Sequence, residues 1–170
     1  MDKELSVIIL NPTIDLLSDE LKSAIYNLNQ ENIPALGAVN DLKHVQQLYD
    51  FCTYCYLAMK KEQLIAFVFV MDESSLYQSP NYKYFKANYN SFLYVDRVAV
   101  SHIYQRKGVG VELYDQIFLK CIEAKIPLCC EVNTFPLNQQ SLDFHFKNKF
   151  EIIEEVDFGK KKVVMLVKQP

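Results

Sequence analysis

The feature that most restricts the fold is a junction at residues 98–110, where an apolar run meets a short polar loop and then an amphipathic helical pattern. The run ends in Val98-Ala99-Val100, and the loop ends in Gln105-Arg106-Lys107-Gly108-Val109-Gly110. The chain has four glycines, and two of them lie here. Glycine allows close approach of the backbone to a ligand or a positive φ. Because the first turn of a helix leaves N–H groups unpaired at its positive end, the junction predicts a phosphate socket.

Two other phosphate motifs do not fit this junction. No Lys-Ser or Lys-Thr follows the glycines, as a Walker A loop requires, and Leu113 stands where a Rossmann fingerprint has its third glycine. Arg106 and Lys107 add positive charge beside the socket. A turn that needs glycine only for packing remains the alternative.

The rest of the chain predicts one domain over residues 1–170, of the α+β class (three-layer α/β type), with a mixed, mostly antiparallel sheet flanked by helices. Residues 72–91 are expected to be a long loop rich in aromatic side chains, which either pin the loop to the core or form a wall over a substrate. We expect strands over 4–10, 53–59, 63–71, 92–100, 128–132, 150–157 and 161–168, and helices over 15–29, 41–51, 108–124 and 138–149.

The glycine loop resembles the Q/R-x-x-G-x-G/A loop of the GNAT superfamily of N-acetyltransferases, and the order of elements is similar to that family's fold. The resemblance implies that acetyl-CoA is the co-substrate, with its pyrophosphate held by loop N–H groups and its pantetheine arm paired with the backbone of Val98 and Val100. The implied cofactor-binding residues are Val98, Ala99, Val100, Gln105, Arg106, Lys107, Gly108, Val109, Gly110, Val111, Asn138 and Ser141.

A second stretch resembles the family's L-E-V strand followed by N-x-x-A-x-x-L-Y-x-x-x-G-F. The chain has Cys130-Glu131-Val132, and Asn138 begins the second part. Ser141 replaces the alanine, Lys149 replaces the glycine, and His145 replaces a tyrosine that often serves as general acid. Positions 138, 141 and 145 share one helix face, and Asn138 also suits an N-cap.

Acetyl transfer to an amine needs two proton transfers. An amine with a pKa near 10.4 must lose a proton before it attacks, and the departing thiolate must gain one. Glu131 is the first candidate for the base and Asp96 the second, because Asp96 shares a strand face with Val98 by two-residue alternation. His145 is the candidate acid, although a packed, hydrogen-bonded histidine is the alternative. Candidate acceptor contacts are Tyr77, Tyr82, Tyr84 and Phe85.

Composition restricts the partners. The net charge of −3 and the single basic cluster at 160–162 predict no nucleic-acid partner. Apolar runs such as 64–71 are far shorter than the roughly 20 residues of a membrane span, and the N-terminal run is too short for a secretory signal. We therefore expect a cytoplasmic protein. The five cysteines lack the spacing of a zinc site, so we expect buried thiols and no metal.

Three interpretations remain open at this point. The first is an N-acetyltransferase in which an unidentified primary amine attacks acetyl-CoA directly in a ternary complex. The second is a non-catalytic acyl-CoA-binding regulatory module on the same fold. The third is an interaction protein whose glycines only shape a turn. An edge strand in the closing hairpin would also allow a homodimer.

Overall fold

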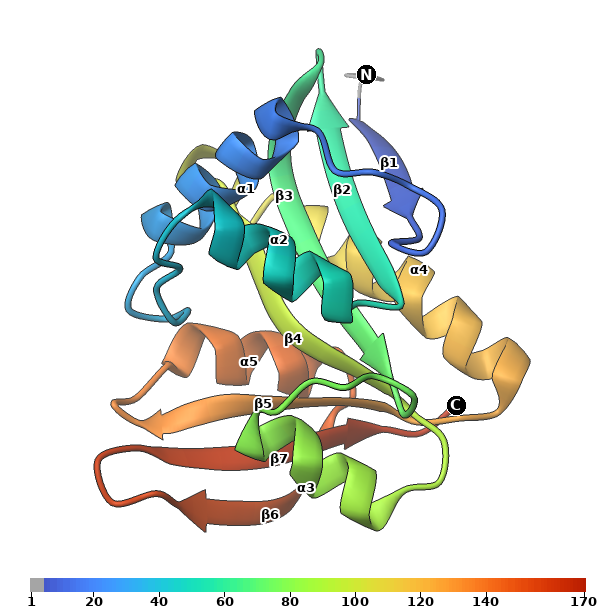
Figure 1. Ribbon diagram of the computed structural model, residues 1–170. Helices are drawn as coiled ribbons and strands as arrows, with labels where there is room; N and C mark the ends of the chain where they lie inside the picture. The colour runs from blue at the N-terminus through green and yellow to red at the C-terminus, as the bar shows by residue number, and fades with distance from the viewer. Residues whose placement is uncertain (1–4) are drawn as a thin grey trace.

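The structure, a computed structural model, describes residues 5–170, so the predicted first strand residue, Glu4, lies outside the described residues. The strands and helices follow the predicted order, with one further helix (Figure 1). They are β1 (Leu5–Leu10), α1 (Asp19–Glu31), α2 (Leu42–Phe51), β2 (Tyr54–Lys60), β3 (Gln63–Asp72), α3 (Pro80–Asn88), β4 (Leu93–Val100), the 3-10 turn η1 (His102–Tyr104), α4 (Val109–Ala124), β5 (Leu128–Phe135), α5 (Gln139–Lys147), β6 (Glu151–Asp157) and β7 (Lys162–Lys168).

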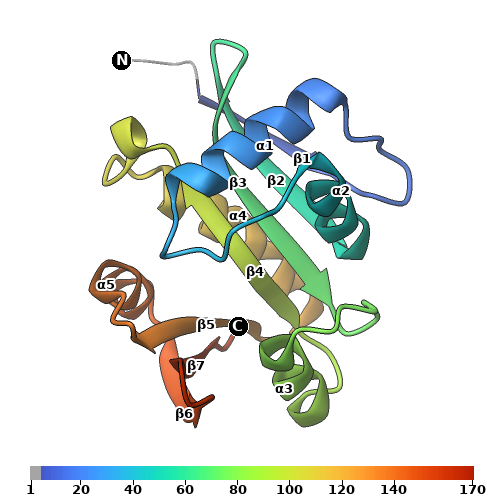
Figure 2. The same ribbon diagram turned by 60° about the vertical axis from the view of Figure 1, so that its left-hand side comes forward.

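The strands form one seven-stranded sheet in the order β1-β2-β3-β4-β5-β7-β6. Every neighbouring pair is antiparallel except β4 and β5, which confirms the predicted mixed, mostly antiparallel sheet. The β4–β5 pairing covers only Leu93 with Leu128 and Tyr94 with Cys129. Beyond these residues the two strands diverge, as Figure 2 shows, and the sheet opens between them.

Helices cover both faces of the sheet, with α1 and α2 on one face and α4 on the other (Figures 1 and 2). The face under α1, α2 and α3 carries one apolar cluster, which includes Ile25, Leu48 and Phe85. The opposite face carries a second cluster, which includes Leu113 of α4 and Leu142 of α5. The core is therefore two layers of side chains separated by the sheet, which matches the three-layer prediction.

The cysteines confirm the expectation of buried thiols. All five are free and buried. Cys129 belongs to the cluster under α1–α3 and Cys130 to the cluster under α4, as neighbouring strand residues on opposite faces should.

The loop prediction for residues 72–91 was wrong, because this segment contains α3. Pro80 stands at the start of the helix, where its fixed φ favours helical geometry. Tyr82 and Phe85 lie one turn apart and are both fully buried, so α3 has an apolar face of only two large residues. The short apolar pattern was hidden among polar Asn and Lys residues.

The first helix also begins later than predicted. Ser18 caps it, since the Ser18 hydroxyl accepts a hydrogen bond from the Leu21 amide, and α1 starts at Asp19. Leu16 lies within the predicted helix range of 15–29, but it precedes α1 and is 96% exposed.

Candidate active site

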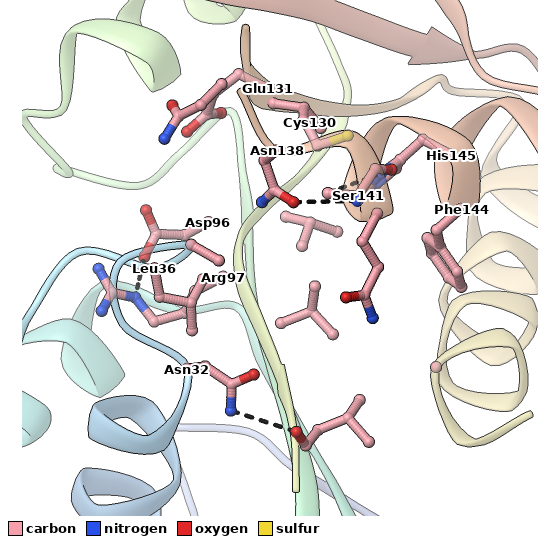
Figure 3. A pocket seen from close by; sticks show the side chains of 18 of the residues that line it. Asn32, Leu36, Asp96, Arg97, Cys130, Glu131, Asn138, Ser141, Phe144 and His145 are labelled. Carbon is pink, nitrogen blue, oxygen red and sulfur yellow. Dashed lines mark hydrogen bonds and ion pairs between the residues drawn. The ribbon is translucent and has the colours of Figure 1, made fainter. Parts of the chain in front are cut away.

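A cleft of about 1330 Å³ lies where β4 and β5 diverge. Its walls come from both strands, from the α1–α2 connection, from the loop before α4 and from α5. Figure 3 shows Glu131 and Asp96 on one side of this cleft, and Asn138, Ser141, Phe144 and His145 on the other.

The backbone of β4 forms one wall of the cleft. The Ser101 amide donates to the Ile65 carbonyl of β3 at 2.8 Å. By alternation, the backbone N–H and C=O groups of Ala99 also point toward β3, while those of Val98 and Val100 point toward the opening. Val98 and Val100 line the cleft, and Ala99 is buried away from it. This is the geometry that pairing of Val98 and Val100 with an extended ligand requires.

The carbonyl of Val100 is already engaged by two side chains. Asn32 Nδ2 donates to it at 3.3 Å, and Gln105 Nε2 donates to it at 3.1 Å. Gln105 also reaches Asn32 Oδ1 at 3.3 Å. The predicted cofactor residue Gln105 therefore connects the glycine loop to the α1–α2 connection, and strand-like pairing of a ligand would use Val98 and the Val100 amide.

The glycine loop ends in a helix start with open amides. Gly108 is the N-cap of α4 at φ 84°, and the Glu112 amide is the donor to its carbonyl. The amides of the three residues between them lie in the first turn and have no intrahelical acceptor. Gly108 and Gly110 require glycine for different reasons. A Cβ at Gly108 would meet no atom within 4 Å, so the positive φ is what requires glycine there, whereas a Cβ at Gly110 would lie 3.4 Å from the Phe144 ring.

The basic pair of the loop, Arg106 and Lys107, is exposed. Arg106 has φ 57°, and the Lys107 ammonium lies 5.7 Å from the centre of the Tyr104 ring. Arg106 lines the cleft together with Gly108, Gly110 and Val111. The predicted loop residues are thus brought together around one helix N-terminus that carries positive charge.

Glu131 of β5 is held by two donors. The Tyr94 hydroxyl donates to Oε2 at 2.8 Å, and the Asn81 amide nitrogen donates to Oε1 at 3.0 Å. Burial raises the pKa of the Glu131 carboxyl from 4.5 to about 7, with a further increase from the negative charge of Asp96, while the two hydrogen bonds and Lys161 oppose the rise. A carboxyl with this pKa can accept a proton near neutral pH.

Asp96 does not follow the simple alternation that the sequence suggested. The register between β3 and β4 shifts at Phe69 and Val70, so Asp96 sits in a bulge between the paired residues Val95 and Arg97. Its carboxylate accepts from Arg97 Nε at 2.8 Å. Asp96 lines the cleft beside Glu131, but it is already paired with a guanidinium group.

His145 is buried within α5, at 3% exposure. Its Nδ1 lies 2.7 Å from the Ser141 carbonyl oxygen, which assigns the ring proton to Nδ1 and leaves Nε2 to accept from the Tyr114 hydroxyl at 3.0 Å. Burial lowers the pKa of His145 to about 4. The ring is therefore neutral near pH 7, and both of its nitrogens are engaged.

Asn138 and Ser141 lie at the start of the same helix. The Asn138 side-chain oxygen accepts from the Ser141 amide at 3.2 Å, which confirms the predicted N-cap. Both residues line the cleft.

The aromatic segment contributes less to the cleft than the sequence suggested. Tyr77 lines the cleft, whereas Tyr82 and Phe85 are fully buried in the core. The Tyr84 hydroxyl donates to Glu154 of β6 at 3.0 Å, away from the cleft walls. The segment instead supplies Asn81, a cleft residue that the sequence analysis missed because no motif marks it.

The structure divides the predicted catalytic residues between the two faces of the sheet. Glu131 contacts Tyr94, which belongs to the apolar cluster under α1–α3. His145 packs against Tyr114 and Phe150, which belong to the cluster under α4. The cleft passes through the sheet between these faces, so two ligands could meet there from opposite sides.

Comparison with models of protein families matches residues 22–150 to the Acetyltransferase (GNAT) family. The chain belongs to this family. A comparison with curated protein sequences finds no match.

Solved structures share the fold at low sequence identity. The chain is similar to Naa50 of Arabidopsis thaliana in complex with a bisubstrate analogue, with TM-score 0.69, 16% identity, and 98% of this chain and 99% of that chain covered. It is similar to Ard1 of Thermoplasma volcanium, with TM-score 0.70, 13% identity, and 98% and 97% covered. It is also similar to an N-acetyltransferase of Staphylococcus aureus Mu50, with TM-score 0.66, 13% identity, and 96% and 98% covered.

The cleft fits the acetyl-CoA that the family uses. The open amides at the start of α4 suit a pyrophosphate, and the exposed edge of β4 at Val98 suits an extended amide arm. Within residues 5–170 no helix is long and apolar enough to cross a membrane. No three His, Cys, Asp or Glu side chains in that same range are grouped as metal ligands.

Proposed function

We propose that this chain transfers the acetyl group of acetyl-CoA to a primary amine, by direct attack of the amine in a ternary complex. The observation that carries the proposal is Glu131, a carboxyl group with a pKa of about 7 at the point where β4 and β5 diverge. Near neutral pH about half of this group is ionised and able to take a proton from an ammonium group.

The proposed binding of acetyl-CoA uses the glycine loop and the edge of β4. The amides of residues 109–111 and the charge of Arg106 would hold the pyrophosphate, Val98 would pair with the pantetheine arm, and Asn138 and Ser141 would line the opposite wall. The bound molecule supplies a thioester acetyl group. The protein contributes position and proton transfer, and positioning alone can lower a barrier by about 7–11 kcal/mol.

Glu131 is the proposed general base, and Asp96 raises its pKa rather than replacing it. The amine enters from the face of α1–α3 as an ammonium ion, gives one proton to Glu131, and attacks with the released lone pair. We assign the second proton transfer, to the departing thiolate, to the hydrogen-bonded pair of Tyr114 and His145 on the opposite wall. Because His145 Nε2 carries no proton, the proton would come from the Tyr114 hydroxyl, which would turn from His145 to the thiolate and remain a phenolate until it takes a proton from solvent. Burial raises the pKa of Tyr114 and opposes this step.

A covalent route through cysteine is the chemical alternative to direct attack. Cys130 is the only cysteine among the described residues that line the cleft. Burial raises the pKa of its thiol well above the ordinary value, and the neighbouring Glu131 charge raises it further. Because the thiolate is the nucleophile, a thiol held in this state supports direct attack by the amine.

Calorimetric titration with acetyl-CoA tests the cofactor site. We expect micromolar affinity for the wild type and no measurable binding to Gly108→Glu, which places a negative side chain beside the pyrophosphate socket. Gly159→Glu is the matched control, because Gly159 has φ 85° and open space around its Cβ position, like Gly108, but lies in the β6–β7 turn. Equal loss in both variants, or full affinity of a folded Gly108→Glu protein, would refute the site.

Thiol release in the presence of amines separates the enzyme from the non-catalytic module. A panel of peptide N-termini, lysine side chains, polyamines and amino acids is mixed with acetyl-CoA and the full chain. Release of coenzyme A thiol that depends on the amine supports the proposal. Binding of acetyl-CoA without release for any amine supports the regulatory module.

A further inference from the structure

The helix α3 is the part of the site that the sequence did not predict. It is held in place by its buried face, where the Tyr82 ring lies 5.5 Å and the Phe85 ring 5.8 Å from the ring of Tyr94. The Tyr82 hydroxyl also donates to the Asp72 carbonyl at 2.7 Å. These contacts fix the first turn of α3 against β4 and β5, and Asn81 lies in that turn.

In residues 5–170, the side-chain amide of Asn81 has a hydrogen-bond partner for its nitrogen but none for its oxygen. Its nitrogen donates to Glu131 Oε1 at 3.0 Å, and the residue is 8% exposed. Its oxygen, Oδ1, is buried and has no hydrogen-bond partner anywhere in residues 5–170. Buried carbonyl oxygens are nearly always paired in proteins, because an unpaired one loses its hydration without compensation. Asn81 is also part of the cleft wall, so the missing partner can come from a ligand.

The groups around this oxygen define what that partner must be. Glu131 carries a negative charge when ionised, and Asp96 adds a second one close enough to raise the Glu131 pKa. The Arg97 guanidinium group is already bonded to Asp96 and to Asn29 Oδ1 at 2.9 Å. The Lys161 ammonium lines the cleft and offsets the rise of the Glu131 pKa only in part. A ligand group that satisfies an acceptor oxygen beside these carboxylates must be a hydrogen-bond donor and is favoured if it is a cation.

We propose that Asn81 Oδ1 accepts an N–H of the substrate amine while Glu131 takes its proton. This inference rests on the proposed function and assigns Asn81 as a positioning residue for the amine. An ammonium group has several N–H bonds, so one can reach Glu131 and another Asn81. After the proton has moved to Glu131, the amine keeps an N–H on Asn81, and that bond fixes the direction of its lone pair.

The same arrangement selects amines over alcohols. A hydroxyl group has a single hydrogen, which Glu131 would take up, and Asn81 Oδ1 would then stay buried without a partner. A site that leaves a buried polar group unpaired discriminates strongly against the deficient ligand. The arrangement therefore requires at least two N–H bonds on the protonated amine, which the proposed primary amine supplies.

Two variants at position 81 separate this function from a purely structural one. Asn81→Asp and Asn81→Leu both remove the N–H that bonds Glu131, and both stay close to asparagine in size. Only Asn81→Asp keeps an acceptor oxygen. Asn81→Asp also adds a negative charge beside Glu131, so weaker ammonium binding to Asn81→Leu than to Asn81→Asp reports the acceptor oxygen together with its charge. Loss of the hydrogen bond to Glu131 is common to both variants.

The probe is n-butylammonium chloride, titrated into the full chain at about pH 8, where the amine is charged and Glu131 is mostly ionised. Binding is followed by NMR, in the wild type through the side-chain amide signal of Asn81 and in all proteins through backbone signals of β5. We expect a shift of the Asn81 signal, affinity of Asn81→Asp equal to or tighter than wild type, and at least tenfold weaker binding to Asn81→Leu. 1-Butanol should cause no comparable shift in any of the proteins.

Three results would overturn the inference: no binding of n-butylammonium to the wild type, equal affinity in the two variants, or an equal response to 1-butanol. The backbone spectrum of each variant shows whether it is folded, and Asn81→Asp gives a positive signal that an unfolded protein could not give. Failure of the proposed function is seen separately, because it is tested by acetyl-CoA binding and its loss in Gly108→Glu.

Discussion

Glu131 combines partial burial with two hydrogen-bond donors, and this combination makes its role testable by pH. The group must be ionised to act as a base, and its pKa is about 7. We expect kcat/KM to fall about tenfold per pH unit below that value and to level off above it. Glu131→Gln should lower kcat on the order of 10²- to 10⁴-fold and remove this acid limb, while acetyl-CoA affinity stays within about twofold.

Asp96→Asn is the control that separates the two candidate bases. Removing the Asp96 charge lowers the pKa of Glu131, so the acid limb should move to lower pH and persist. If Asp96 were the base, Asp96→Asn would abolish the limb and Glu131→Gln would keep it. Thiol release measured across the pH range distinguishes these outcomes.

His145 needs a different test, because both of its ring nitrogens already form hydrogen bonds within the protein. Its ring accepts from Tyr114 and donates to Ser141. If the pair serves the departing thiolate, His145→Phe should lower kcat on the order of 10²-fold with little change in acetyl-CoA affinity, and Tyr114→Phe should do the same. Equal turnover of a folded His145→Phe protein would remove His145 from the mechanism and leave it a packing residue.

At the scale of elements, α3 shows how a short helix depends on its buried face. Tyr82 is fully buried and bonded to Asp72, whereas Tyr84 is partly exposed and contacts Glu154. Tyr82→Ala should lower the free energy of unfolding by about 3–5 kcal/mol, and Tyr84→Ala by about 1 kcal/mol or less. Urea denaturation measures both. Similar losses would mean that α3 is not anchored through Tyr82.

The divergence of β4 and β5 is the other element that function depends on. If β4 and β5 were paired along their whole length, the backbone groups of Val98 would be hydrogen-bonded within the sheet, and no ligand could pair with them. Here the pairing stops after Tyr94, and β5 continues with β7 as its partner. The same opening exposes Glu131 on one side and the start of α5 on the other.

At the scale of the whole molecule, the sequence predicted what depends on local pattern. The strand–loop–helix junction, the other strands and most helices follow from short-range periodicity and from glycine placement. The bulge at Asp96 and the donors to Glu131 could not be predicted in this way. Asn81 and Tyr94 reach Glu131 across 50 and 37 residues of sequence, so only the assembled sheet brings them together.

Glu131 and His145 also give the whole molecule a characteristic dependence of stability on pH. The pKa of Glu131 is raised from 4.5 to about 7, so between these values the folded state binds a proton that the unfolded state lacks, and stability falls as pH rises. The pKa of His145 is lowered from 6.5 to about 4, so between these values the unfolded state binds the extra proton, and stability rises with pH.

The two effects oppose each other between about pH 4.5 and 6.5, and single substitutions should separate them. Relative to wild type, Glu131→Gln removes the falling contribution, so its free energy of unfolding should rise with pH by up to about 1.4 kcal/mol per unit. His145→Phe removes the rising contribution and should give a slope of the opposite sign. Urea denaturation at several pH values in this range measures both slopes, and all other titrating groups cancel in the comparison with wild type. Parallel curves for the three proteins would show that neither group is perturbed by burial, and the assignment of Glu131 as a base near neutral pH would lose its physical support.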